Sequence, residues 1–203
     1  MKILYATQNA AKVRNMRRRL AGTGIEIVTP EELGICVEID ENGSTVAENA
    51  MKKAEAYAPL TDIPVLAADS GLLIDGLPGE EQPGTHVRRF NGRLMTDDEM
   101  IDHYAALAAR LGGAAKAHYI TGLAMIAFGK HFCETFPENE FLMVSAPNPN
   151  RFHTGNPLDV IAVDPATGSY HNTLPDSAFK DAAWTFERAC RKFVTEALDA
   201  NPQ

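Results

Sequence analysis

The sequence contains little cysteine and no cysteine motif. Three cysteines, Cys36, Cys133 and Cys190, are spread over 203 residues, and none belongs to a C-x-x-C pair. An odd number of widely spaced cysteines does not support a disulfide framework or a zinc site. We therefore expect three reduced thiols that act as packing residues.

Long hydrophobic runs and a positive net charge are also missing. The longest apolar stretches have the length of a strand and no basic leader precedes an apolar segment, so we expect no membrane span, no signal peptide and a cytoplasmic protein. The net charge of −8 disfavours nucleic acid as a partner. The arginines in residues 14–19 are interpreted as a solvated helix face, because no aromatic side chains alternate with them.

What the sequence does contain is an α/β pattern. With 45% hydrophobic residues, a chain of this length can form one substantial core, and we expect a single domain over residues 1–203. Hydrophobic periodicity and turn residues predict strands at 2–6, 25–28, 64–68 and 158–164. They predict helices at 10–21, after Thr45, after Thr96 and at 176–198. An antiparallel pair of strands is expected within 117–129 and 131–146, with the second strand interrupted at Pro137. Thr45 and Glu48 form a predicted capping box.

The segment ATQNAAKVRNM, residues 6–16, follows the first strand and opens the first helix. A helix N-terminus offers free N–H groups and a positive dipole end, which favour a bound phosphate, and Lys12 adds a charge one turn later. The alternative is that Thr7 or Asn9 is only an N-cap and that Lys12 is solvated. Both interpretations remain open, and the P-loop pattern G-x-x-x-x-G-K-[ST] is absent.

A second polar segment is the acidic loop before the Thr45 helix. Glu38, Asp40 and Glu41 provide oxygen ligands, which suit magnesium when substrate phosphates complete the coordination. An acidic surface loop is the alternative. In the helix that follows, Asn49 and Lys53 are four residues apart and share a face. Lys53 is a candidate for contacting the same phosphates as Lys12, and an ordinary helix-surface lysine is the alternative.

The third polar segment is Asp69-Ser70-Gly71, which interrupts an apolar stretch. We expect the strand to end or kink there, with Asp69 binding a metal, activating water or forming a local Asx-turn. The tripeptide also matches the D-[ST]-G of aspartic proteases. That chemistry needs a second carboxylate from another copy, and the helical segments contradict such a fold.

These segments, in this order, resemble the inosine triphosphate pyrophosphatase family, also called the Ham1-like nucleoside triphosphate pyrophosphatases. The resemblance covers the first 92 residues and rests on ATQNAAKVRNM, STVAENAMKKA, ADSGLLIDGLPG and PGTHVRRFNG. It implies an α/β fold with two lobes around a central cleft and a long mixed central sheet flanked by helices. It also implies a homodimer that cleaves a nucleoside triphosphate, with Mg²⁺, into a nucleoside monophosphate and pyrophosphate.

The resemblance implies roles for individual residues as well. Asp69 and Lys53 correspond to the catalytic residues, and Glu41 and Asp69 to the metal ligands. The implied substrate-binding residues are Thr7, Gln8, Asn9, Lys12, Ser70, Arg88, Asp159 and Lys180.

Several departures from the family pattern mark a divergent member. Ala68 replaces the first Asp of Asp-Asp-Ser-Gly, and Gln8 replaces a Gly of the phosphate turn. The aromatic of the G-F-G-[YW]-D loop is missing from Gly155–Asp159, and the last helix lacks Ser-His-Arg. We therefore expect an altered base preference. Two alternatives stay open: a hydrolase of another nucleotide or phosphorylated metabolite, such as the pyrimidine triphosphates handled by Maf-like proteins, and a catalytically weak nucleotide-binding protein.

Overall fold

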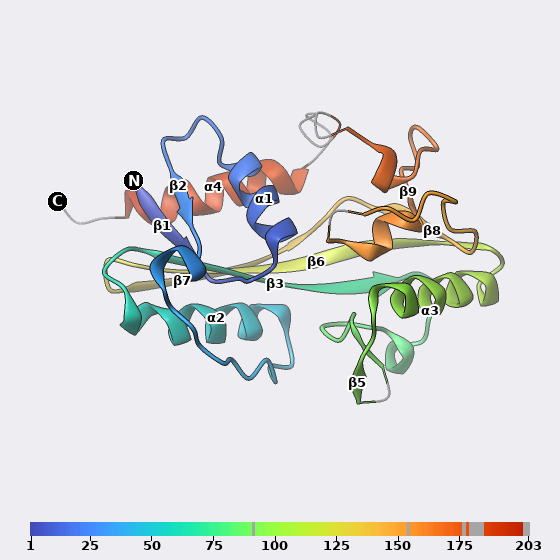
Figure 1. The fold of residues 1–203 in the computed structure, drawn as a ribbon, viewed down its shortest axis with the longest axis horizontal. Helices are drawn as coiled ribbons and strands as arrows, with labels where there is room; N and C mark the ends of the chain where they lie inside the picture. Colours follow the sequence, from blue (N-terminus) through green and yellow to red (C-terminus); the bar gives the residue numbers. More distant parts are fainter. Residues whose placement is uncertain (91, 154, 176–177, 179–184, 201–203) are drawn as a thin grey trace. The chain divides into compact units, whose positions relative to one another are not determined.

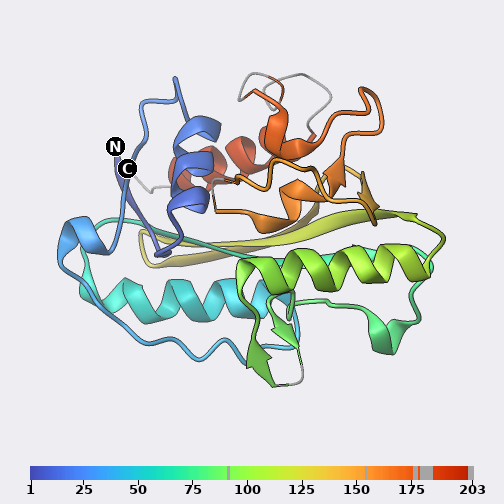
Figure 2. The same ribbon diagram turned by 45° about the vertical axis from the view of Figure 1, so that its right-hand side comes forward.

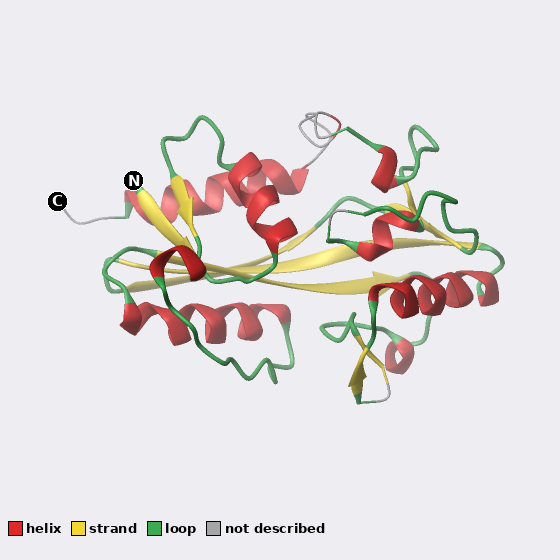
Figure 3. Cartoon of the chain, in the orientation of Figure 1, coloured by secondary structure: helices red, strands yellow, loops and turns green. Residues whose placement is uncertain are grey.

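The described part of the chain contains a seven-stranded mixed β-sheet, a separate two-stranded sheet formed by β4 and β5, and four α-helices (Figures 1 and 3). The structure is a computed structural model that describes residues 1–90, 92–153, 155–175, 178 and 185–200. The strands are β1 (Lys2–Tyr5), β2 (Glu26–Val28), β3 (Val65–Ile74), β4 (Arg89–Phe90), β5 (Arg93–Leu94), β6 (Ala114–Ala127), β7 (Lys130–Pro137), β8 (Phe141–Val144) and β9 (Ala162–Val163). The α-helices are α1 (Ala10–Arg19), α2 (Val46–Tyr57), α3 (Asp97–Arg110) and α4 (Thr185–Asp199).

The sheet has the strand order β2-β1-β3-β6-β8-β9, with β7 paired to β6. Strand β1 pairs in parallel with β2 and β3, as expected for a β-α-β opening. Strand β6 pairs antiparallel with β7 and β8, and β8 pairs antiparallel with β9. The expected α/β class and the long mixed sheet are therefore confirmed, as is the break at Pro137, where β7 ends.

The chain divides into two compact units, which are named unit 1 and unit 2. Unit 1 comprises Met1–Ser70, Ile120–Pro137 and Thr185–Gln203, and unit 2 comprises Gly71–Tyr119 and Glu138–Trp184. Strands β3 and β6 contribute residues to both. Within the part of the chain that the structure describes, no helix is both long enough and apolar enough to cross a bilayer.

In unit 1, both faces of the strands are covered. Helices α1 and α4 lie on one face and α2 on the other (Figures 1 and 2). Successive side chains of a strand point to opposite faces, so Leu66 and Ala68 of β3 join the α1/α4 core, whereas Val65 and Ala67 pack with α2. This alternation decides where the polar residues that follow on β3 must point.

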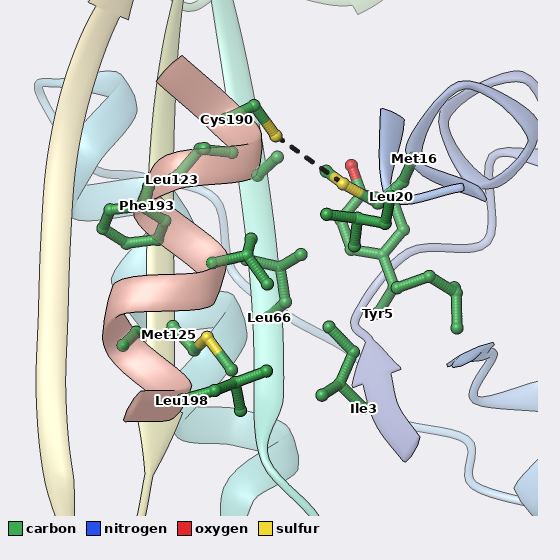
Figure 4. Close-up of a cluster of buried hydrophobic side chains, with 14 of the residues drawn as sticks. Ile3, Tyr5, Met16, Leu20, Leu66, Leu123, Met125, Cys190, Phe193 and Leu198 are labelled. Atoms are coloured by element: carbon green, nitrogen blue, oxygen red, sulfur yellow. Dashed lines mark hydrogen bonds between the residues drawn. The ribbon is translucent and has the colours of Figure 1, made fainter. Parts of the chain in front are cut away.

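The α1/α4 core brings together segments from both ends of the chain (Figure 4). Met16 of α1 and Cys190 of α4 are both buried, and their sulfur atoms lie 3.7 Å apart. Cys190 is thus the packing residue that was expected. Cys36 and Cys133 are also free thiols, but both are exposed, so the packing role predicted for them is wrong.

In unit 2, α3 packs against β8 and the 3-10 helix Pro157–Val160. Thr96 caps α3 through a complete capping box with Glu99, and the buried residues of the helix include Met100, Ile101 and Tyr104. Further 3-10 helices within the described ranges include Glu31–Leu33, Ala58–Leu60, Gly79–Glu81 and His171–Thr173.

Four sequence predictions about these elements need correction. The predicted strand at 158–164 is wrong over its first half, because Pro157 supplies the first residue of a 3-10 helix, a position that needs no N–H donor. Strand β3 does not end or kink at residues 69–71, but continues to Ile74. Helix α1 ends at Arg19 instead of residue 21. Thr45 caps α2 as expected, yet the carboxylate of Glu48 accepts hydrogen bonds from Ser44.

Candidate active site

Buried polar side chains of unit 1 gather where α2 meets the sheet. Among the described residues, four polar or charged residues are buried, with exposed fractions of 2% for Asn49, 8% for Lys53, 6% for Asp69 and 3% for Thr121. All four belong to unit 1, and three of them are bonded to one another. Burial of a polar group costs free energy unless the group is hydrogen-bonded, so this concentration requires an explanation.

Helix α2 places two polar residues on its buried face. The buried positions of the helix recur every three or four residues, which is the period of a helix face that packs against a sheet. The buried residues of α2 are Val46, Asn49, Ala50, Lys53, Ala54 and Tyr57. Among them, Asn49 and Lys53, four residues apart, point their polar groups toward β3.

Asp69 meets both side chains because of its position on β3. It shares the strand parity of Val65 and Ala67, whose side chains pack with α2. One carboxylate oxygen, Oδ1, accepts a hydrogen bond from Lys53 Nζ at 2.8 Å, and Oδ2 accepts one from Asn49 Nδ2 at 3.1 Å. The polar interruption that the sequence shows at this point is therefore a buried ion pair with a helix, and no Asx-turn is needed to explain it.

Glu41 completes a charged group around Lys53. Lys53 Nζ lies 3.1 Å from Glu41 Oε2, so a single ammonium group bridges the two predicted metal carboxylates, Glu41 and Asp69. Glu41 is more accessible, with a side chain that is 44% exposed. The loop that carries Glu41 is held by α2, because Gly43 N donates to Asn49 Oδ1 at 2.7 Å.

The turn between β1 and α1 contributes polar side chains to the same region. Asn9 caps α1, and its Oδ1 accepts hydrogen bonds from Ala11 N at 2.8 Å and Lys12 N at 3.2 Å. Thr7 Oγ1 in turn accepts one from Asn9 N. The capping interpretation is thus confirmed for Asn9, and two N–H groups of the helix terminus are already bonded to its side chain. Phosphate binding by this turn stays a prediction.

A cavity of about 220 Å³ joins these segments. Among its lining residues are four predicted site residues: Thr7 and Gln8 from the β1–α1 turn, Glu41 from the loop and Lys53 from α2. Thr7 and Gln8 also line a neighbouring cavity of about 860 Å³, beside α1 and residues 29–36. The β1–α1 turn therefore meets the Glu41 loop and α2, more than 30 residues later in the chain, at one polar cavity.

The sequence model described as the Ham1 family matches residues 3–139, which is more than half of the chain and includes every residue of the charged group. The chain belongs to the Ham1 family.

Individual Ham1-family relatives agree with this assignment. The chain is 41% identical over 105 residues to the dITP/XTP pyrophosphatase of Methylococcus capsulatus, covering 52% of this chain and 51% of the relative. It is 39% identical over 131 residues to the dITP/XTP pyrophosphatase of Symbiobacterium thermophilum, covering 62% of this chain and 61% of the relative. The matched part thus spans about half to three fifths of these relatives.

Solved structures extend the likeness to nearly the whole chain. A HAM1 protein from Coxiella burnetii superposes with a TM-score of 0.74 at 25% identity, covering 97% of this chain and 100% of the other. The Staphylococcus aureus Ham1 protein, at 22% identity, gives a TM-score of 0.70 with 97% and 99% coverage, and shares the fold. The expected fold is therefore shared beyond the region in which the sequence motifs are clear.

One departure from the Ham1-like pattern has a structural explanation. Ala68 lies next to Asp69 on β3, but its side chain points to the opposite face, where it is 6% exposed and packs in the core with Tyr5 and Leu66. A carboxylate at this position would point away from the Lys53–Asp69 pair. The methyl group of Ala68 instead contributes to the α1/α4 core.

The remaining predicted residues lie elsewhere or outside the described part. Ser70 faces the α1/α4 side of the sheet, where its Oγ lies 2.9 Å from Thr121 Oγ1. In unit 2, Arg88 donates to Asp97 Oδ1 at 2.6 Å, and Asp159 accepts from Asn156 Nδ2 at 2.7 Å. Lys12 lies on α1 and is half-buried. Lys180 is outside the described residues.

The donor set around Lys53 suits a magnesium ion only if a ligand completes it. In the described ranges, no group of three or more His, Cys, Asp or Glu side chains is placed to hold a metal. Glu41 and Asp69 offer two carboxylates that both contact Lys53 Nζ. Mg²⁺ is commonly held by one or two carboxylates, substrate phosphates and water, so these two residues fit a metal that arrives with a phosphate ligand.

The sequence interpretation assigned no role to Asn49 and Thr121. A signal was available for Asn49, because a polar residue on the buried stripe of an amphipathic helix needs a buried partner. Thr121 carries a weaker signal: it is the polar residue of the stretch ITGLAM and shares the strand parity of Leu123 and Met125, which are buried in the α1/α4 core.

Proposed function

We propose that this Ham1-family chain hydrolyses a nucleoside triphosphate to a nucleoside monophosphate and pyrophosphate, with Mg²⁺, at the site around Asp69 and Lys53. The observation that carries the proposal is the buried Lys53–Asp69 pair beside Glu41, at a polar cavity that the β1–α1 turn also lines. The dITP/XTP pyrophosphatase activity named for the two relatives supports it.

A structural role alone explains the buried pair poorly. Replacing a buried ion pair by well-packed apolar residues is often neutral or stabilising, so such a pair is weak evidence for a contribution to stability. Here Lys53, one member of the pair, lines a cavity together with Glu41, which it also contacts. Charged groups held at a cavity are what a reaction on a polyanionic substrate requires.

The proposed chemistry assigns work to each side chain. Glu41 and Asp69 would hold the magnesium ion, which when bound neutralises phosphate charge. Each Asp69 oxygen accepts one protein hydrogen bond and keeps a lone pair, so Asp69 can accept a hydrogen from a water molecule and orient it. Attack of the water oxygen on the α-phosphorus breaks the bond to the bridging oxygen, the water proton passes through Asp69 to solvent, and pyrophosphate leaves.

Lys53 would change partners during this reaction. Its ammonium group has three donors, two of which are directed to Asp69 and Glu41. A triphosphate in the cavity offers further oxygen acceptors, and Lys53 and Lys12 would stabilise the charge on the departing pyrophosphate. Thr7, Gln8 and Asn9 would position the phosphates at the start of α1.

Base selection is proposed to differ from inosine and xanthosine. The support is the stretch from Gly155 to Asp159, which contains no aromatic residue and whose Pro157–Val160 part forms a 3-10 helix. Ser70, Arg88, Asp159 and Lys180 stay predicted substrate contacts. The single domain, the homodimer and the cytoplasmic location stay predictions as well.

The experiment that tests the proposal is pyrophosphate release from a panel of ribo- and deoxyribonucleoside triphosphates, with and without Mg²⁺. Three proteins are compared: the wild type, Asp69→Asn, and Asp62→Asn as a matched control at an exposed position of the same unit. We expect Mg²⁺-dependent release in the wild type and the control, and a loss of at least about 100-fold in Asp69→Asn. Equal release by all three proteins, or none by any, contradicts the proposal.

A further inference from the structure

The Asn49 side chain uses both ends of its amide inside unit 1. Its Nδ2 donates to Asp69 Oδ2 at 3.1 Å, and its Oδ1 accepts from Gly43 N at 2.7 Å. The residue is 2% exposed, so neither hydrogen bond is replaced by bulk water. One side chain thus connects β3 to the loop that carries Glu41.

Few other side chains can make this connection. The amide group has a donor and an acceptor on the same carbon, whereas an aspartate would offer only acceptors and a leucine neither. Glutamine is one methylene longer and would shift both contacts. The site therefore selects asparagine by chemistry and by length.

The loop side of the contact is equally restricted. A Cβ added to Gly43 would lie 2.5 Å from Asn49 Oδ1 and 2.9 Å from Glu48 Cβ, distances at which atoms overlap. Gly43 therefore brings its backbone against the amide as only a residue without a side chain can. Ser44, the next residue, is held by the carboxylate of Glu48, so two neighbouring positions of α2 fix the end of the loop.

We propose that Asn49 is a positioning residue that couples the Glu41 loop to Asp69, so that the two carboxylates meet one metal ion together. The inference rests on the proposed function. Asn49 itself touches neither substrate nor metal in this account. It fixes the orientation of one carboxylate through Nδ2 and the path of the loop that carries the other through Oδ1.

Two variants interrupt the connection at different points. Asn49→Leu keeps the approximate size of the side chain and removes both hydrogen bonds. Gly43→Ala keeps the asparagine and places a methyl group against Asn49 Oδ1, so it disturbs the connection from the loop side. The matched control is Ala54→Gly, a fully buried position of the same helix without polar contacts, which destabilises α2 through its backbone.

The deciding readout is metal affinity, measured as Mn²⁺ binding by electron paramagnetic resonance at a fixed concentration of inorganic phosphate, which supplies the phosphate ligand that completes the site. Loss of an outer-shell partner of a metal ligand commonly costs about 10- to 100-fold in affinity, and we expect that range for Asn49→Leu and a smaller loss for Gly43→Ala. Ala54→Gly should bind Mn²⁺ like the wild type. In turnover at saturating Mg²⁺, Asn49→Leu should lower kcat with little change in KM.

The possible results separate the inference from the proposed function. If Asn49→Leu and Gly43→Ala bind Mn²⁺ as tightly as the wild type, the positioning role is wrong, whatever the activity. A loss of affinity in Ala54→Gly equal to that in Asn49→Leu would also overturn it, because simple destabilisation would then suffice. Should Asn49→Leu not fold, Gly43→Ala decides alone. If both variants bind Mn²⁺ more weakly than the wild type, but the wild type releases no pyrophosphate, Asn49 is still a positioning residue and the proposed reaction is wrong.

Discussion

Replacement of Lys53 by methionine is expected to destabilise the protein far more than loss of an ordinary lysine. The Lys53 and Asp69 side chains are only 10% and 9% exposed, and Nζ and Oδ1 lie 2.8 Å apart. Methionine fills much of the same volume, so the substitution chiefly removes the charge. It leaves the Asp69 carboxylate buried beside an apolar group, where Asn49 Nδ2 still donates a hydrogen bond to it.

The size of the effect follows from this geometry. Two unit charges at 2.8 Å attract by roughly 6 kcal/mol at an effective dielectric constant of about 20. Part of that attraction offsets the desolvation of both groups in the wild type. Removal of one partner of a buried pair therefore costs about 3 to 5 kcal/mol. For a chain of this length, the expected fall in Tm is roughly 6 to 20 °C.

The assay is urea unfolding followed by circular dichroism, with Lys52→Met as the matched control. Lys52 is the preceding residue of α2 and is half-buried, but its hydrogen bond to Asn42 is exposed to solvent, so its loss should change the free energy of unfolding by less than about 1 kcal/mol. In the double variant Lys53→Met/Asp69→Asn, the cost should be smaller than the sum of the single costs by about 1 to 3 kcal/mol. Equal costs for the Lys53 and Lys52 variants, or strict additivity, would refute the reasoning.

Three further predictions concern the rest of the chain. Gly122→Ala should lower the free energy of unfolding by about 1 to 3 kcal/mol or more, because a Cβ there would lie 2.5 Å from a carbonyl oxygen of α2; Gly79→Ala, where nothing lies within 4 Å, should be nearly neutral in the same unfolding assay. Arg93 and a backbone N–H lower the pKa of Glu99 from 4.5 to about 2. The contribution of ionised Glu99 to the stability of the folded state is therefore complete above pH 4.5 and lost as the pH falls toward 2. In Arg93→Gln, carboxyl NMR titration should show the pKa of Glu99 return toward 4.5. Burial lowers the pKa of His171 from 6.5 to about 4, so the folded state should lose stability as the pH falls from 6.5 to 4, and His171→Phe should flatten that loss in pH-dependent unfolding.

Local sequence signals predicted the elements whose own residues determine them. Helix α3 begins at Thr96 because its capping box is formed within four residues, and α1 begins after Asn9 for a similar reason. A short apolar stretch identified β1, and the alternation of apolar and polar residues identified β2. The predictions failed where residues distant in the sequence determine the structure. Strand β3 continues through Asp69 because Lys53 of α2, 16 residues earlier, is the partner of its carboxylate, and no local sequence pattern indicates this contact.

The sequence indicated several residues of the candidate site, but not the hydrogen bonds that join them. Order and spacing of the motifs selected Thr7, Glu41, Lys53 and Asp69, and the structure places the first three at one cavity and bonds the fourth to Lys53. The contact of Asn49 with both Asp69 and the Glu41 loop depends on the packing angle of α2 on the sheet, which the sequence does not reveal. The opposite direction of Ala68 follows from strand parity and was predictable once β3 was known to be continuous.

The most direct test of the account is the identity of the phosphorus products, followed by ³¹P NMR, when the wild type acts with Mg²⁺ on the triphosphate of the panel that it hydrolyses fastest. Cleavage at the α-phosphorus predicts the nucleoside monophosphate and pyrophosphate in equal amounts at early times, with formation at least about 100-fold slower in Asp69→Asn. A nucleoside diphosphate and orthophosphate as the first products, or undiminished turnover by Asp69→Asn, would contradict the central claim.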